Sequence, residues 1–293
     1  MKRILPVLAV LVTACSNEEA PDRQPPPSGS EWSTLIEDGW TLPPGGEATD
    51  RCTKVTLQED VYISAVRPVH PLGTHHTFLA LSDSADGERC TPAVATGLIY
   101  AAGLGSQGLE LPEGVAMHFM AGQVLNLSLH LYNVSGSELT GTSGIEVKRM
   151  DPADVVHESG PLLAGPVDIS IPPGRHTLTH ECSLTEPQTA YAIFPHMHQL
   201  GVHFKTTIIS GGTPKVLHDA DYDFKEQAQL PISLELAAGD RIATECTYEN
   251  PGTETVTFGE SSNTEMCFTV LFRYPRLGTF CRRNDTPAPG SGS

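Results

Sequence analysis

Four of the twelve histidines in this 293-residue chain form close pairs that could bind metal ions. His196 and His198 lie two residues apart in FPHMHQLG, so an extended strand would carry both rings on one face, where they can chelate one ion. His75 and His76 are adjacent in THHTFLAL, so a regular strand would point their rings to opposite faces. This second pair could share an ion if both rings turn back along the strand or if a bulge re-aims one of them.

Two further residues could complete such sites. His130 lies on the polar face of the alternating segment LNLSLHLYN, where the alternative is an ordinary solvated histidine. Met266 begins the apolar segment EMCFTVLF and could equally be a core side chain. Two imidazoles and a thioether form a soft ligand set that suits copper, particularly Cu(I), whereas zinc prefers His, Cys or carboxylate and calcium prefers oxygen. The pattern therefore predicts copper, with His203 outside the site because strand parity turns it to the other face.

Short strands must position these residues. Alternating segments such as VYISAV, HTFLAL, VDISI and TVTF are separated by turns rich in the 27 glycines and 24 prolines. Because no segment sustains a helical apolar period, we predict an all-β, antiparallel fold with sandwich or jelly-roll packing. The folded part, roughly 240 residues, could form one large domain or two smaller ones. We expect two, covering residues 46–151 and 152–283.

The N-terminal residues predict export. Lys2 and Arg3 precede the apolar run Ile4–Val12, so residues 1–14 are expected to be a signal peptide. VTAC resembles a bacterial lipobox, which predicts lipidation of Cys15; the alternative is a plain signal peptide with a chance cysteine. We expect residues 15–45 to be a disordered tether and residues 284–293 a disordered tail. These features predict a lipoprotein anchored to the membrane of a bacterial cell envelope, periplasmic or on the outer surface.

The net charge limits the possible binding partners, and the cysteine content predicts disulfides. The formal net charge is −17, with 35 acidic against 18 basic residues, which argues against nucleic acid or an anionic membrane surface as a partner and is compatible with attracting cations. Six cysteines remain besides Cys15, and in an exported protein they predict three disulfides, with fifteen connectivities open. None of them has the CxxC spacing of a zinc or redox site. No sequence feature predicts an oligomeric state.

The segments HH, LHLYN, HMHQLG and EMC, in this order, resemble the copper type II, ascorbate-dependent monooxygenases, the family of peptidylglycine α-hydroxylating monooxygenase and dopamine β-monooxygenase. The resemblance covers residues 51–281. It implies two antiparallel, jelly-roll-like β-sandwich domains with a copper site in each, facing an interdomain cleft. The implied ligands of the electron-storing copper are His75, His76 and His130. Those of the oxygen-binding, catalytic copper are His196, His198 and Met266.

The resemblance also selects among the disulfide connectivities. It implies a pair Cys246–Cys267, next to the methionine ligand, and a pair Cys182–Cys281, which would close the second domain. Cys52–Cys90 then remains, and it brackets the segment that contains His75 and His76.

The activity implied by the resemblance is hydroxylation of a C–H bond by O2, with two copper ions and an ascorbate-like reductant. Peptide-amidating members of the family hold the peptide carboxylate with an arginine before the H-x-H motif and with an asparagine and a tyrosine after the Met-Cys pair. This chain has Phe194, Phe268 and Val270 there, so we expect a small apolar or aromatic substrate rather than peptide amidation. The alternatives are a non-catalytic, surface-tethered copper-binding protein and a disulfide-rich β-sandwich lipoprotein with incidental histidines.

Overall fold

The computed structural model describes residues 31–86, 90, 97–103, 105–259 and 263–281. The predicted signal peptide, Cys15 and the predicted tail 284–293 lie outside these residues. The described part contains twenty strands and one short 3-10 helix, η1 (Pro152–Asp154), so the all-β prediction is confirmed. None of its helices has the length and apolarity needed to span a membrane.

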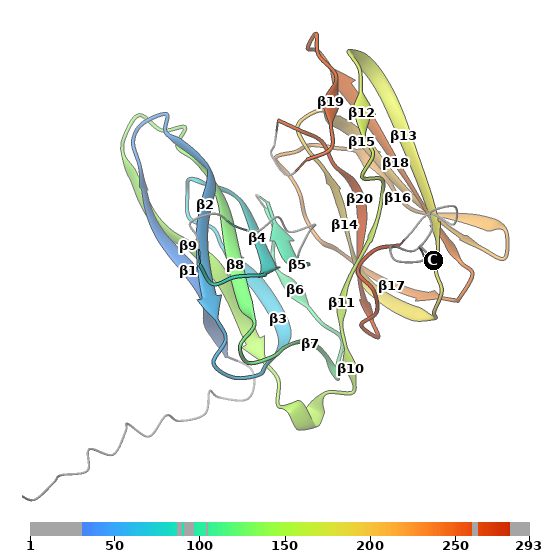
Figure 1. The fold of residues 1–293 in the computed structure, drawn as a ribbon, viewed down its shortest axis with the longest axis horizontal. Coiled ribbons are helices and arrows are strands. Elements are labelled where there is room, and N and C mark those ends of the chain that lie inside the picture. The colour runs from blue at the N-terminus through green and yellow to red at the C-terminus, as the bar shows by residue number, and fades with distance from the viewer. Residues whose placement is uncertain (1–30, 87–89, 91–96, 104, 260–262, 282–293) are drawn as a thin grey trace, which may run out of the picture.

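Strands from the first half of the chain form two sheets, on one side of the molecule in Figure 1. The larger sheet has the order β1-β9-β3-β7-β10, with β6 paired to β3. Its strands are β1 (Trp32–Leu42), β3 (Val61–Val69), β6 (Leu109–Glu110), β7 (Val115–Phe119), β9 (Leu139–Arg149) and β10 (His157–Glu158). The smaller sheet has the order β2-β8-β4-β5. Its strands are β2 (Glu47–Thr56), β4 (Thr74–Ser82), β5 (Leu98–Ala102) and β8 (Val124–Tyr132).

Strands from the second half form three sheets on the other side. One has the order β11-β20-β14-β17, and its strands are β11 (Gly160–Ala164), β14 (Gln188–Met197), β17 (Leu230–Leu236) and β20 (Cys267–Tyr274). The next has the order β13-β18-β15-β16, and its strands are β13 (Gly174–Ser183), β15 (Gly201–Ser210), β16 (Thr213–Asp221) and β18 (Arg241–Asn250). The third pairs two short strands, β12 (Ser170–Ile171) and β19 (Val256–Thr257).

Strands before residue 159 and strands after it belong to different sheets. Within the described residues no sheet mixes strands from before and after this point. The η1 helix lies just before it, where the side chain of Asp151 accepts a hydrogen bond from the backbone N–H of Ala153 and Pro152 begins the helix. Neighbouring strands pair antiparallel, except that β10, which follows η1, runs parallel to β7.

The first strand corrects one expectation. Residues 15–45 were expected to be a disordered tether, but β1 (Trp32–Leu42) pairs with β9 and forms the edge of the larger sheet. Ile36, Trp40 and Leu42 share one strand face and are buried. Burial of these three large apolar side chains stabilises the segment against the core. Disorder is therefore wrong for this part of the predicted tether.

The two halves of the chain share a hydrophobic core. The largest cluster of buried apolar side chains contains Leu79, Tyr100 and Leu129 from the first half together with Phe194 and Val270 from the second. Two smaller clusters contain side chains from the second half. The halves therefore pack directly against each other rather than being joined only by the connection at η1.

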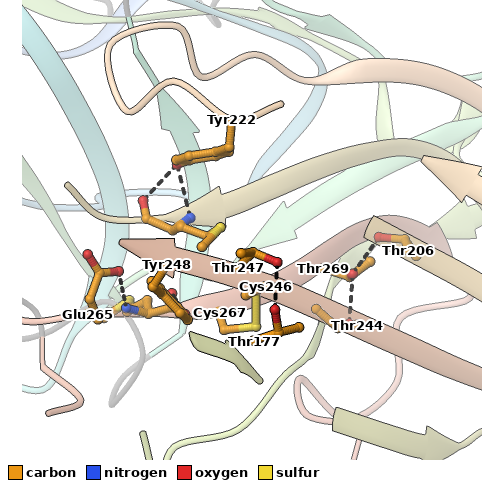
Figure 2. Close-up of a disulfide and its surroundings, with 12 residues drawn as sticks. Thr177, Thr206, Tyr222, Thr244, Cys246, Thr247, Tyr248, Glu265, Cys267 and Thr269 are labelled. Atoms are coloured by element: carbon orange, nitrogen blue, oxygen red, sulfur yellow. Dashed lines mark hydrogen bonds between the residues drawn. A yellow bond between two sulfur atoms is a disulfide. The ribbon is translucent and has the colours of Figure 1, made fainter. Parts of the chain in front are cut away.

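Three disulfides crosslink the structure, with the same pairing that the resemblance implies: Cys52–Cys90, Cys182–Cys281 and Cys246–Cys267. Figure 2 shows the third, which joins β18 to the first residue of β20. Three disulfides indicate an extracytoplasmic protein, because the cytoplasm keeps thiols reduced.

Candidate metal centres

His75, His76 and His130 converge on one point. One ring nitrogen from each lies within 4.8 Å of the other two. His76 on β4 is paired with His130 on β8, and the register of this pair shifts between Thr74 and His76. This irregularity is the bulge that adjacent histidines need in order to share an ion, and it brings the Nδ1 atoms of His75 and His76 to 3.1 Å from each other.

The outer nitrogens of two of these rings are held by the protein. His130 Nε2 lies 2.7 Å from a carboxylate oxygen of Glu47, and His76 Nε2 lies 3.2 Å from the backbone oxygen of Phe224. If each Nε2–H donates to its oxygen, the lone pair remains on Nδ1, inside the cluster. Such outer partners are the usual means by which proteins fix the tautomer and orientation of metal-binding histidines.

Burial keeps the His75 and His76 rings neutral, which is the form of histidine that binds metals. Burial, followed by repulsion from His75, lowers the pKa of His76 to about 2. Burial also lowers the pKa of His75, helped by the nearby His130 and Lys225. His75 and His76 are therefore ready to bind a cation without first losing a proton at neutral pH.

His196 and His198 form the second candidate site, with Met266. The two imidazole centroids are 5.2 Å apart. β14 ends at Met197, which is paired with Cys267, the first residue of β20. Continuation of this antiparallel register would place His198, just after β14, opposite Met266, just before β20. Opposed residues share a face of a sheet, and Met266 is 3% exposed. The register therefore places the thioether residue beside the histidine pair.

The rings of the second site use the opposite nitrogen to contact the protein. His196 Nδ1 lies 2.8 Å from the side-chain oxygen of Gln227, and His198 Nδ1 lies 2.9 Å from the backbone oxygen of Thr264. Donation from Nδ1–H assigns Nε2 as the ligand atom of both rings. Burial, followed by repulsion from His198, lowers the pKa of His196 to about 3, so this ring is neutral as well.

Glu265, which the sequence reasoning did not select, organises the strand ends at this site. Its carboxylate is fully buried and accepts hydrogen bonds from the backbone N–H groups of His198 (2.9 Å), Leu200 (2.7 Å) and Met266 (3.3 Å). Figure 2 shows Glu265 among the residues around the disulfide Cys246–Cys267. Burial raises its pKa to about 7, while the three backbone donors act in the other direction. Its position next to Met266 in TEMC was the available sequence signal.

The donor set fits copper. Three imidazoles at one site, and two imidazoles beside a thioether at the other, are soft to intermediate ligands that suit copper ions in both oxidation states. His203 was expected to lie outside the site. Its Nε2 lies 3.1 Å from a carboxylate oxygen of Asp219, and the two residues are on the paired strands β15 and β16.

The three predicted substrate-pocket residues, Phe194, Phe268 and Val270, lie together beside His196. Val270 is paired with Phe194 and Phe268 with His196, so all four share one face of the β14-β20 pair. The rings of Phe194 and His196 stack with centroids 5.6 Å apart. Phe194, Phe268 and Val270 are at most 2% exposed. The surroundings of His196 on this face are therefore apolar.

The segment between β16 and β17 links the two histidine groups. The ring centroid of Phe224 is 4.6 Å from that of His76 and 6.1 Å from that of His198. Gln227, in the same segment, contacts both His76 and His196. DFKEQAQ reads as an ordinary polar connection, so no local signal in the sequence identified either residue.

Comparison with known proteins agrees with this geometry. Residues 158–288 match the family described as copper type II ascorbate-dependent monooxygenase, C-terminal domain. The chain is 29% identical to MOXD1 homolog 1 of Drosophila melanogaster over 215 residues, 66% of this chain and 30% of that protein. It is 25% identical to peptidyl-glycine alpha-amidating monooxygenase A of Xenopus laevis over 248 residues, 75% of this chain and 26% of that protein.

The match over residues 158–288 and the distant likeness to these relatives relate the chain to the copper type II ascorbate-dependent monooxygenases, a family of oxidoreductases. The chain spans less than a third of the length of each of these two curated relatives.

Proposed function

We propose that this protein hydroxylates a C–H bond of a small apolar or aromatic substrate, using O2, two copper ions and an ascorbate-like reductant, and that it does not amidate peptides. The reaction R–H + O2 + 2e⁻ + 2H⁺ → R–OH + H2O needs two electrons. Each copper ion supplies one, which gives a reason for two sites. The observation that carries the proposal is the convergence of His75, His76 and His130 within 4.8 Å.

The two candidate sites divide naturally between the two halves of the chain. We propose that strands β1 to β10, before residue 159, and strands β11 to β20, after it, form two β-sandwich domains, each holding one copper. The change of sheets near residue 159 supports this division. The rings of His76 and His198 both contact Phe224, which supports two sites facing each other.

The side chains around the sites would orient the copper ligands and exclude water. Glu47 and the Phe224 carbonyl orient His130 and His76, while Thr264 orients His198. Glu265 holds the backbone that carries the second ligand set. Copper, when bound at this second set, would supply the reactivity toward O2 that no protein side chain provides.

The apolar face beside His196 is the proposed substrate surface. Phe194, Phe268 and Val270 offer no charge or hydrogen-bond donor to a peptide carboxylate, and burying that carboxylate unpaired would be costly. Because these side chains are at most 2% exposed, substrate must displace the side chains that cover them. Turnover of a glycine-extended peptide at a rate comparable with that of an apolar substrate would contradict this part of the proposal.

The first test measures copper content and oxygen use together. We expect two copper ions per chain, with one lost in His130→Ala and the other lost in Met266→Ala. We expect ascorbate-dependent O2 consumption above that of free copper, with one oxygen atom from ¹⁸O2 found in the product by mass spectrometry. His203→Ala is the control, because His203 pairs with Asp219 rather than with a candidate ligand, and this variant should keep both coppers.

Two results would contradict the proposal. A chain that binds two coppers but consumes no O2 across a panel of apolar amines, alcohols and lipophiles would be a copper-binding protein without catalysis. A chain that retains both coppers in His130→Ala or Met266→Ala would show that the ions bind elsewhere.

A further inference from the structure

Gln227 is a buried residue that forms hydrogen bonds with residues of both halves of the chain. Its backbone oxygen accepts hydrogen bonds from Gly103 N (3.3 Å) and from the hydroxyl of Ser106 (2.9 Å), both in the first half. Its side chain is 3% exposed and lies between the two histidine groups. Side-chain Oε1 is 2.8 Å from His196 Nδ1, and side-chain Nε2 is 3.0 Å from the backbone oxygen of Phe224.

The same Phe224 oxygen is also 3.2 Å from His76 Nε2. A carbonyl oxygen has two lone pairs, so it can accept hydrogen bonds from both His76 Nε2–H and Gln227 Nε2–H. Those two nitrogens are 3.4 Å apart, as two donors that share an acceptor can be. A continuous chain of hydrogen bonds therefore runs from His196 through Gln227 and the Phe224 carbonyl to His76.

The direction of this chain suits copper binding at both ends. As described, Gln227 Oε1 accepts from His196 Nδ1–H, which leaves the His196 lone pair on Nε2. The shared Phe224 oxygen accepts from His76 Nε2–H, which leaves the His76 lone pair on Nδ1, the atom 3.1 Å from His75 Nδ1. A flipped Gln227 amide would donate to His196 Nδ1 and move the ring proton to Nε2, where a metal lone pair is needed.

We propose that Gln227 is a positioning residue shared by the two copper sites, which sets the tautomer of His196 and couples its orientation to that of His76. This inference deepens the proposed function and rests on it, since it assumes that both histidine groups bind copper. Through the shared Phe224 carbonyl, copper bound at one site favours the ring orientation that the other site needs. By thermodynamic reciprocity, each copper should then raise the affinity for the other.

The first measurement uses the metal-free protein, so its result does not depend on catalysis. Histidine-selective ¹⁵N NMR should find the Nδ1–H tautomer at His196 and the Nε2–H tautomer at His76. Gln227→Ala should give a mixture of tautomers at His196, because the acceptor for Nδ1–H is removed. An unchanged His196 signal in Gln227→Ala would overturn the proposal.

The second measurement is Cu(I) affinity at each site, by competition with a chromophoric chelator. The His130→Ala background reports the second site, and the Met266→Ala background reports the first. Loss of an outer hydrogen-bond partner typically lowers metal affinity by about 10- to 100-fold, so Gln227→Ala should weaken both sites by about tenfold or more. Gln227→Glu, which keeps the acceptor for His196 and loses the donor to Phe224, should weaken the first site while sparing the second.

Two matched variants make the result specific. Glu47→Ala removes a partner of His130 and should weaken the first site alone. Gln229→Ala removes a side chain of the same segment that donates to Ala101 in the first half, and it should weaken neither site. If Gln227→Ala weakens one site alone, or if Gln229→Ala has the same effect as Gln227→Ala, the shared role of Gln227 is wrong. If all affinities behave as expected but substrate is not hydroxylated, the proposed function alone fails.

Discussion

At the scale of single residues, the two candidate sites use the imidazole ring in opposite ways. His76 and His130 contact the protein through Nε2, whereas His196 and His198 contact it through Nδ1. The acceptors are two side chains and two backbone carbonyls, one on each ring. Because each acceptor fixes one tautomer, the choice of ligand nitrogen is made by residues outside the ligand set.

His70 provides a prediction for the metal-free protein. Burial lowers its pKa to about 4, from the value of about 6.5 expected in the unfolded chain. Because the unfolded state binds the proton more readily, the contribution of His70 to stability is complete above about pH 6.5 and is lost as the pH falls toward 4. Between pH 7 and pH 5 this loss should reach about 2 kcal/mol.

Urea unfolding of the wild type and of His70→Gln at both pH values measures this effect. Glutamine does not titrate and can still bond to the hydroxyl of Thr77, which lies 2.6 Å from His70 Nε2. The variant should therefore lose less stability on acidification than the wild type. An identical loss in the two proteins would show that His70 does not carry the pH dependence.

At the scale of elements, strand ends carry the ligands and crosslinks hold the strand ends. Tyr222 bonds to both backbone groups of Met197, with its hydroxyl 3.0 Å from the nitrogen and 2.7 Å from the oxygen (Figure 2). Tyr248 donates to the backbone oxygen of Met266 at 2.7 Å. Next to Met266, the disulfide Cys246–Cys267 joins β18 to β20. These contacts fix the backbone on both sides of the second ligand set.

Removal of this disulfide should therefore affect both stability and one copper site. Its cysteines are 21 residues apart, so a Cys246→Ala, Cys267→Ala double variant should lose about 3 kcal/mol of stability from loop entropy. Copper affinity should fall at the Met266 site and hardly change at the His130 site. Denaturant unfolding and site-resolved Cu(I) titration check these two outcomes.

The matched control removes Cys182–Cys281, whose cysteines lie away from both ligand sets in the chain. This control should also lower stability but should leave both copper affinities near the wild-type values. Equal weakening of the Met266 site in the two double variants would mean that the disulfides act through global stability alone.

At the scale of the whole molecule, the shared core joins the two halves. Phe272 on β20 is fully buried and belongs to the cluster that also contains side chains of the first half. We therefore expect the halves to unfold together. The chain contains two tryptophans, Trp32 and Trp40, and both lie on β1, so tryptophan fluorescence reports on the first half alone.

Phe272→Ala tests this coupling. The substitution should cost about 3–5 kcal/mol, because a large buried ring is replaced by a cavity. If the halves are coupled, the midpoint followed by tryptophan fluorescence should fall as much as the midpoint followed by circular dichroism. A fluorescence midpoint that stays at the wild-type value would show that the halves unfold independently.

The sequence by itself determined the strands and the identity of the candidate ligands. Alternation in LNLSLHLYN placed His130 on a polar face, and the spacing of His196 and His198 placed two rings on one face, because the side-chain period of a strand is two residues. The prediction of a disordered tether was wrong for β1, because it was based on the proline-rich composition of the residues that precede this strand. It overlooked the alternation that buries Ile36, Trp40 and Leu42.

The tertiary structure decided how those ligands are brought together and oriented. The bulge in β4 brings the imidazole rings of His75 and His76 together. This bulge depends on pairing with β8, which lies far along the chain. Glu47, Phe224 and Gln227 act on histidines 31 to 151 residues away, through contacts that no local pattern encodes. Local periodicity tells which way a side chain points, but the nitrogen that faces a metal depends on which distant acceptor reaches the other side of the ring.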